Sequence, residues 1–170
     1  DGQGAPLSAF FHCHINKKRN DFITFVNLGG FSNITLKFRQ RILGFDTGPA
    51  NYLIDMWCRK KFNMEYDSEG KHALQGNIHP RLLKSLLSHK YFKTKPPKST
   101  GFEDFNWGWL ENHLLKFKDI NRFDVLSTLT YFTIITISNE INKHKPKSKY
   151  IYFCGGGSNN TLLVQGILGL

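Results

Sequence analysis

Three short apolar segments near the start of the chain constrain its fold more than any other feature. Residues 22–27 are apolar and β-branched, residues 33–38 alternate apolar with polar side chains, and residues 42–45 are again apolar. These patterns are typical of β-strands. The intervening turns are too short for a crossover helix, so the three segments predict an antiparallel meander.

After residue 50 the apolar spacing changes from that of strands to that of helices. The pattern predicts helices from Asn51, from Pro80 as the first helical residue, over residues 107–117, and from Asp124 as an N-cap. Residues 93–101 contain two prolines and are expected to be a loop. A fourth strand over residues 150–154 and a final helix capped by Ser158 or Asn159 complete a mixed α/β sheet with packed helices.

Composition excludes some classes of protein. Hydrophobic residues make up 40% and charged residues 21% of the chain, which is ordinary for a folded globular domain. The most apolar run, residues 125–137, is interrupted by Ser and Thr, so no membrane span is expected. The three cysteines are far apart, which favours free thiols in a reducing compartment and a cytoplasmic location.

The net charge of +10 raises the question of a nucleic-acid partner. Most of the basic residues are Lys, and Lys, Asn, Ile and Phe all have AT-rich codons, so the base composition of the genome accounts for the charge. No RNA- or DNA-binding motif accompanies it. The sequence therefore predicts no nucleic-acid partner.

Three predicted strands end in glycine-rich turns beside polar residues: Asn27 to Gly30, Asp46 to Pro49, and Gly155 to Asn159. Glycine lets backbone N–H groups approach a phosphate closely, and the third turn precedes a helix, whose N-terminus favours anions. The alternative is that each turn is only a hairpin or a helix entry.

Asp46 is the carboxylate in these turns. A carboxylate that leaves a strand just before a helix can point into a cleft and act as a general base. The same position is equally compatible with an N-cap of the following helix. The sequence presents no side-chain spacing that identifies metal ligands.

Five motifs together resemble one family. Gly2-Gln3-Gly4-Ala5-Pro6-Leu7, Asn27-Leu28-Gly29-Gly30-Phe31-Ser32-Asn33, Gly44-Phe45-Asp46-Thr47-Gly48-Pro49, Lys98-Ser99-Thr100-Gly101 and Cys154-Gly155-Gly156-Gly157 occur in the order and spacing of the anhydro-N-acetylmuramic acid kinases. The resemblance implies the actin-like ATPase (ribonuclease H-like) fold. Residues 1–20 would then end the first lobe or connect the lobes, and residues 21–170 would form the second lobe without its last strand and helix.

The resemblance also implies a reaction. Such kinases use ATP and Mg²⁺ to phosphorylate 1,6-anhydro-N-acetylmuramic acid while water opens the anhydro ring, giving N-acetylmuramic acid 6-phosphate in peptidoglycan recycling. It implies Asp46 as the catalytic base, and it leaves a homodimer open. The implied nucleotide contacts are Asn27, Gly29, Gly30, Asn33, Gly155, Gly156, Gly157 and Asn159, and the implied sugar contacts are Gln3, Thr47, Gly48 and Asn51.

The chain departs from the family pattern in several places. The family's N-terminal phosphate loop has no counterpart, Ala50 replaces a glycine, and Phe102 replaces an arginine. If position 50 required positive φ, alanine would be strained there. These departures leave an alternative open, that the chain is an inactive truncated relic or a non-catalytic binding module.

Overall fold

The computed structural model describes residues 22–39, 41–117, 119–144 and 150–170. Gln3 and the predicted interlobe segment of residues 1–20 lie outside the described residues, so both predictions stay untested. The division of the chain into lobes also stays a prediction.

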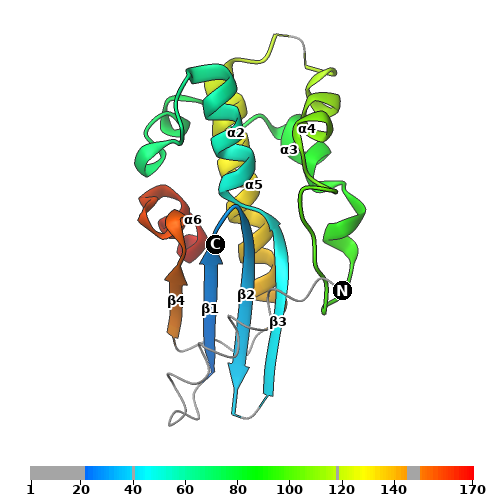
Figure 1. Ribbon diagram of the computed structural model, residues 1–170, viewed down its shortest axis with the longest axis vertical. Coiled ribbons are helices and arrows are strands. Elements are labelled where there is room, and N and C mark those ends of the chain that lie inside the picture. Colours follow the sequence, from blue (N-terminus) through cyan, green and yellow to red (C-terminus); the bar gives the residue numbers. More distant parts are fainter. Residues whose placement is uncertain (1–21, 40, 118, 145–149) are drawn as a thin grey trace.

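Four strands form one mixed sheet in the order β3-β2-β1-β4 (Figure 1). β1 (Ile23–Leu28), β2 (Phe31–Phe38) and β3 (Arg41–Pro49) make the predicted antiparallel meander. β4 (Tyr150–Cys154) pairs in parallel with β1 on its other side. The sheet therefore pairs β1, the first strand of the described chain, with β4, which lies more than a hundred residues later in the sequence.

β3 is longer than the sequence predicts. The strand continues through Asp46 to Pro49, where a turn was expected, because these residues still pair with the start of β2. A register shift between Ser32 and Asn33 leaves Thr47 as an extra residue, which is a β-bulge. Pro49 is tolerated because β3 is an edge strand. Asp46 therefore lies within a strand and does not cap the next helix, whose N-cap position is Ala50.

The helices begin close to the predicted points, with two corrections. Pro80 starts its helix as predicted, and the His79 side chain caps it. Asn121, not Asp124, caps the long helix, and Asn160, not Ser158 or Asn159, caps the last one. The bounds are α2 (Asn51–Phe62), α3 (Pro80–Leu87), α4 (Trp107–Leu114), α5 (Arg122–Lys143) and α6 (Thr161–Gly169).

α5 forms the centre of the core. It runs behind the sheet and α2, with α3 and α4 on the β3 side and α6 on the β4 side (Figure 1). The hydroxyls of its buried threonines donate hydrogen bonds to backbone carbonyls, as Thr130 does to Leu126 at 2.9 Å. An apolar helix face that contains threonines can therefore still be buried. Within the described residues, no helix is long and apolar enough to cross a membrane.

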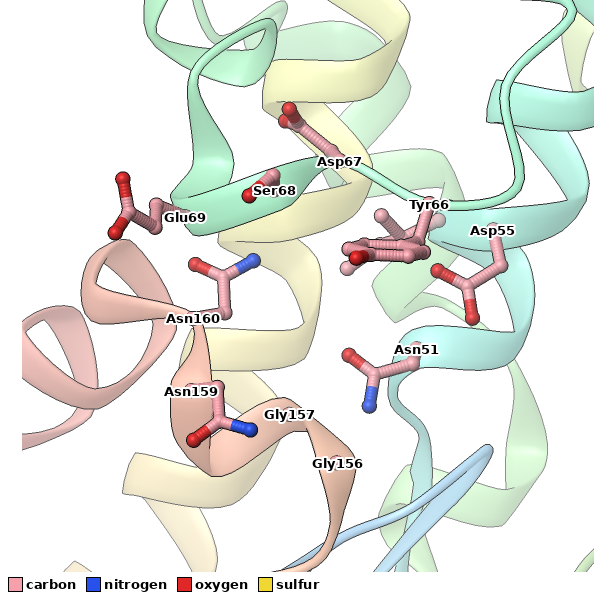
Figure 2. Close-up of a pocket in the computed structure, with 11 residues that line it drawn as sticks. Asn51, Asp55, Tyr66, Asp67, Ser68, Glu69, Gly156, Gly157, Asn159 and Asn160 are labelled. Atoms are coloured by element: carbon pink, nitrogen blue, oxygen red, sulfur yellow. The ribbon is translucent and has the colours of Figure 1, made fainter.

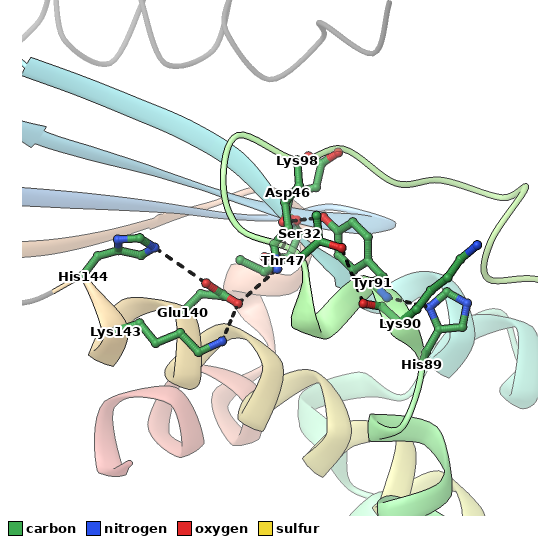
Figure 3. Close-up of polar contacts among 11 residues, drawn as sticks. Ser32, Asp46, Thr47, His89, Lys90, Tyr91, Lys98, Glu140, Lys143 and His144 are labelled. Atoms are coloured by element: carbon green, nitrogen blue, oxygen red, sulfur yellow. Dashed lines mark hydrogen bonds and ion pairs between the residues drawn. The ribbon is translucent and has the colours of Figure 1, made fainter.

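The loop after the short helix Lys90–Lys93 is fixed to α5 by an ion pair. Lys98 Nζ lies 3.1 Å from Glu140 Oε1, and both side chains are almost fully buried (Figure 3). Glu140 Oε1 also accepts a hydrogen bond from Lys143 at 2.9 Å, and Lys98 Nζ lies 4.7 Å from the centre of the Tyr91 ring. A buried charge is tolerated only when it is paired in this way.

We expect the Glu140→Leu substitution to lower the free energy of unfolding by about 3–5 kcal/mol, because it leaves the Lys98 ammonium buried without its partner. Lys98→Met should cost less, because Glu140 keeps Lys143. The double variant should cost clearly less than the sum of the two single ones. Urea denaturation of the three variants checks this, and a change below about 0.5 kcal/mol for Glu140→Leu would contradict a structural role for the pair.

Candidate functional site

Four residues, one from each strand, form one row across the sheet, and three of them are polar. Asp46 pairs with Asn33, Asn33 with Asn27, and Asn27 with Cys154. Directly paired residues project from the same face of a sheet, so these four side chains share one face. All four are half-buried, whereas the neighbouring row of Phe45, Ile34 and Val26 is buried in the core. The register thus brings Asp46, Asn33 and Asn27, three predicted site residues, to one place.

The Asp46 carboxylate is held by the loop that follows the short helix Lys90–Lys93. Its Oδ2 accepts a hydrogen bond from Ser99 Oγ at 2.8 Å and another from the Thr100 backbone N–H at 3.1 Å. Both bonds fall on Oδ2, so Oδ1 is the oxygen to which neither of them is directed. A carboxylate oriented in this way can accept a proton from a bound molecule that reaches this face of the sheet.

The backbone of Asp46 is fixed as firmly as its side chain. Its N–H donates to the Lys98 carbonyl at 3.1 Å, and its carbonyl accepts from the Tyr91 hydroxyl at 2.6 Å. Burial, followed by the nearby Asp46 charge, raises the pKa of Tyr91, which keeps its hydroxyl protonated as a donor. The buried Lys98–Glu140 pair therefore positions the loop, and the loop positions Asp46.

The first glycine turn joins β1 to β2 and holds the start of α2. The Gly30 carbonyl accepts from the N–H groups of Ala50 and Tyr52 at 2.9 and 3.0 Å, and the Gly29 carbonyl accepts from Asn51. The Asn51 side chain also donates to the Leu28 carbonyl at 2.9 Å. The turn's carbonyls are therefore structural, and the role of its N–H groups toward a phosphate stays a prediction.

The triglycine turn after β4 packs against the end of β1. Gly155 has φ of 81°, and a Cβ there would lie 2.5 Å from Asn27 Oδ1 and 2.8 Å from the Leu28 backbone. A Cβ on Gly157 would lie 2.6 Å from Asn51 Nδ2, whereas Gly156 faces open space. Glycine is thus required at 155 by backbone conformation and by close approach.

The final helix follows the triglycine turn as predicted, but it begins slightly later than a cap at Ser158 or Asn159 would place it. The turn leads first into a single 3₁₀ turn, Gly156–Asn159, and α6 starts at Thr161. Three backbone N–H groups between the 3₁₀ turn and the first turn of α6 already donate hydrogen bonds within the protein. Ser158 donates to the Gly155 carbonyl, Asn160 to the Gly157 carbonyl and Leu163 to the Asn160 side chain.

A cavity of about 450 Å³ opens beside this turn. Figure 2 shows Gly156, Gly157 and Asn159 on one wall, with Asn51 and Asp55 of α2 facing them and Ser68 and Glu69 closing the far side. The volume is that of a typical small-molecule site. The lining residues are Asn51, Ile54, Asp55, Tyr66, Asp67, Ser68, Glu69, Gly156, Gly157, Asn159 and Asn160.

The wall residues suit an uncharged polar group better than a phosphate. Asp55 and Glu69 are acidic, whereas Asn159 and Asn160 offer amides and Ser68 a hydroxyl. Carboxylates accept hydrogen bonds but repel phosphate, so this cavity fits a sugar or a base with N–H and O–H donors. Four of the residues predicted for nucleotide or sugar contact line it: Asn51, Gly156, Gly157 and Asn159.

Two predicted sugar contacts lie inside the protein. Thr47 is buried and its hydroxyl donates to the Ser32 carbonyl at 3.3 Å, and Gly48, with φ of 130°, is buried beside the Phe92 ring. Here both shape the bulge that presents Asp46, and their contact with a sugar stays a prediction. Ala50 has φ of −118°, so the strain considered for alanine at this position does not arise.

Sequence reasoning missed several residues of the site. Ser99 and Thr100 resemble part of a phosphate-binding loop, but no glycine frame precedes them. Their function here, orienting Asp46, depends on a contact across more than fifty residues that spacing does not reveal. The sequence around Asp55, Tyr66 and Ser68 indicates only a helix or a loop and does not indicate a binding site. The fold alone places these three residues around one cavity.

Asp55 has an unusual proton affinity. Burial raises its pKa from 3.8 to about 6, partly offset by Arg59 and reinforced by Glu65. The folded chain therefore holds this proton more tightly than the unfolded chain does. Asp55 favours folding most below about pH 4, and this contribution is lost as the pH rises through about 6.

We expect Asp55→Asn to be more stable than the native chain at pH 7.5, because the variant removes a charge from a poorly solvated place. The gain should be below about 1 kcal/mol, since the group is only half buried, and it should vanish near pH 4. Urea denaturation at several pH values checks this, with the exposed Asp119→Asn as control. A difference that does not change with pH would contradict the prediction.

Solved structures with the same fold confirm the predicted fold class. The activator of the 2-hydroxyisocaproyl-CoA dehydratase from Clostridium difficile, solved with bound ADPNP, aligns with a TM-score of 0.54 at 9% identity, over 89% of this chain and 51% of that one. Component A of the (R)-2-hydroxyglutaryl-CoA dehydratase from Acidaminococcus fermentans aligns with a TM-score of 0.55 at 12% identity, over 95% and 57%. The chain has the actin-like ATPase fold.

Sequence relatives identify the family. A curated anhydro-N-acetylmuramic acid kinase from Shewanella frigidimarina is 43% identical over 96% of this chain and 45% of its own length. The anhydro-N-acetylmuramic acid kinases from Burkholderia cenocepacia and Hydrogenovibrio crunogenus are 40% and 41% identical to this chain. The matched part makes up 44% and 45% of their own lengths. The chain thus spans less than half the length of these relatives. A sequence model of the family described as anhydro-N-acetylmuramic acid kinase matches residues 1–170, and the chain belongs to this family.

Proposed function

We propose that this chain is part of an ATP-dependent kinase that phosphorylates 1,6-anhydro-N-acetylmuramic acid and opens its anhydro ring, giving N-acetylmuramic acid 6-phosphate. Family membership supports the reaction class. The observation that carries the proposal is the oriented Asp46 carboxylate, which shares one face of the sheet with Asn33 and Asn27. We further propose a cytoplasmic enzyme of peptidoglycan recycling, and a homodimer stays a prediction.

Asp46 would act as the general base. It would take a proton from a water molecule that attacks C1 of the sugar, and the electron pair of the broken C1–O6 bond would pass to O6. O6 would then attack the γ-phosphorus of ATP and release ADP. Ser99 and Thr100 hold Oδ2, so Oδ1 would receive the proton. The fixed backbone of Asp46 would keep the water in line.

The nucleotide would span the triglycine turn and the first glycine turn. Adenosine fits the cavity of about 450 Å³, whose carboxylates and amides suit its uncharged donors and acceptors. The phosphates would extend away from Asp55 and Glu69, toward Gly29, Gly30, Asn27 and Asn33. Gly155 supports this arrangement, because its backbone packs directly on Asn27 and Leu28 and so joins the two turns.

Mg²⁺ is the cation that this chemistry needs, and it commonly keeps several waters and binds phosphate oxygens with one or two carboxylates. The described residues contain no group of three or more His, Cys, Asp or Glu side chains that could hold a metal ion. This chain therefore fits a cation carried mainly by the phosphates, with Asp46 the carboxylate on the same face of the sheet. The cation would neutralise charge on the transferring phosphoryl group.

The test is formation of N-acetylmuramic acid 6-phosphate from ATP, Mg²⁺ and 1,6-anhydro-N-acetylmuramic acid, followed by ³¹P NMR. We expect product that requires both ATP and the sugar, because the γ-phosphate is transferred to O6. Asp46→Asn should lower the rate at least about a hundredfold. Asp119→Asn, an exposed carboxylate, is the matched control and should leave the rate unchanged.

The same assay separates the proposal from its alternative. Equal product from native chain and Asp46→Asn would contradict a catalytic role for Asp46. A folded chain that binds ATP without forming product over long incubation would favour the inactive relic or binding module instead.

A further inference from the structure

Three aromatic rings from separate parts of the chain form a partly exposed cluster. Phe102 packs edge-on against Tyr52 of α2 at 4.7 Å between ring centres and against Phe31 of β2 at 5.2 Å. Phe31 and Tyr52 are themselves stacked at 5.7 Å. Phe31 and Tyr52 are half-buried, but Phe102 is 60% exposed. We call Phe31, Tyr52 and Phe102 the aromatic wall.

The aromatic wall is connected both to the first glycine turn and to the loop that holds Asp46. Tyr52 donates its backbone N–H to Gly30 of the first glycine turn. Phe102 follows Thr100 by two residues, and Thr100 N lies 3.1 Å from the Asp46 carboxylate. Two residues of chain reach at most about 7 Å, so the Phe102 backbone lies on the order of 10 Å from that carboxylate.

Phe31 ties the aromatic wall to the same region independently. It precedes Asn33 by two residues in β2, so both side chains project from one face of the sheet. Asn33 pairs with Asp46. The aromatic wall therefore borders the face that carries Asp46, from β2 on one side and from the Ser99–Thr100 loop on the other.

An exposed ring, backed by two half-buried rings beside a polar site, points to a ligand with an apolar surface. Ligand sites combine apolar and aromatic walls with a few placed polar groups, and exposed aromatic patches mark such sites. A pyranose ring fits this combination, because its hydroxyls are polar while its C–H groups form an apolar face. The triphosphate of a nucleotide is anionic, so it would gain nothing from contact with three uncharged rings.

We propose that the aromatic wall is a specificity element for the acceptor sugar, packing against the C–H face of the amino sugar and placing it between the first glycine turn and Asp46. The inference rests on the proposed function, since it takes Asp46 as the base and an amino sugar as acceptor. It assigns Phe102, which holds the sugar without touching the reacting atoms, to binding and not to catalysis.

Saturation-transfer NMR with 1,6-anhydro-N-acetylmuramic acid and the whole chain tests this proposal. Irradiation of aromatic protein protons should transfer saturation to the ring protons of the sugar. Phe102→Ser should abolish most of that transfer and weaken sugar binding about five- to tenfold, whereas Phe102→Trp should keep both. Leu115→Ser, which also removes an exposed apolar side chain, should change neither.

Binding of ATP with Mg²⁺, measured by calorimetry on the same variants, separates two kinds of failure. Unchanged sugar affinity in Phe102→Ser, with ATP binding intact, would overturn the proposed role of the aromatic wall and leave the proposed function standing. Binding of ATP without any sugar binding by the native chain would overturn it as well. A folded native chain that binds neither ATP nor the sugar would overturn the proposed function together with the inference.

Discussion

The parallel pairing of β1 with β4 is the constraint on which the site depends. It sets Cys154 opposite Asn27, so the triglycine turn must meet the end of β1 with no room for a side chain at Gly155. The antiparallel meander then extends the same row to Asn33 and Asp46. Residues separated by more than a hundred positions become neighbours because each strand end falls at the same level of the sheet.

A second constraint comes from α5, whose Glu140 side chain pairs with Lys98. The ion pair between Lys98 and Glu140 is removed from water, and it fixes the loop that contains Ser99 and Thr100 to α5. That loop gives Asp46 both of its carboxylate hydrogen bonds and one of its backbone bonds. Local rigidity at a carboxylate is what a general base requires, because misplacement by about an ångström is costly in rate.

Much of the fold could be predicted because it rests on local patterns. The alternation in residues 33–38, the β-branched run in residues 22–27 and Pro80 at a helix start each report a nearby backbone conformation. The errors arose where tertiary contacts override local signals. Asp46 to Pro49 have the Gly and Pro of a turn, yet pairing with β2 keeps these residues in a strand around a bulge.

The candidate site was predictable in part. The glycines stood out because glycine has a physical use at close approaches, and the structure gives Gly155 and Gly157 such contacts. Ser99, Thr100 and Asp55 could not be assigned from the sequence, because a hydroxyl in a loop and a carboxylate on a helix are ordinary until the fold sets them beside Asp46 or a cavity.

The proposed kinase requires that the two glycine turns and the cavity between α2 and the triglycine turn form one nucleotide site. A ¹H–¹⁵N NMR titration with a non-hydrolysable ATP analogue and Mg²⁺ tests this requirement. We expect the largest shift changes at the amides of Gly29, Gly30, Gly156, Gly157 and Asn159. Changes confined to a second hollow, of about 400 Å³ beside Trp57 and Trp107, would contradict a single nucleotide site, as would no change at all.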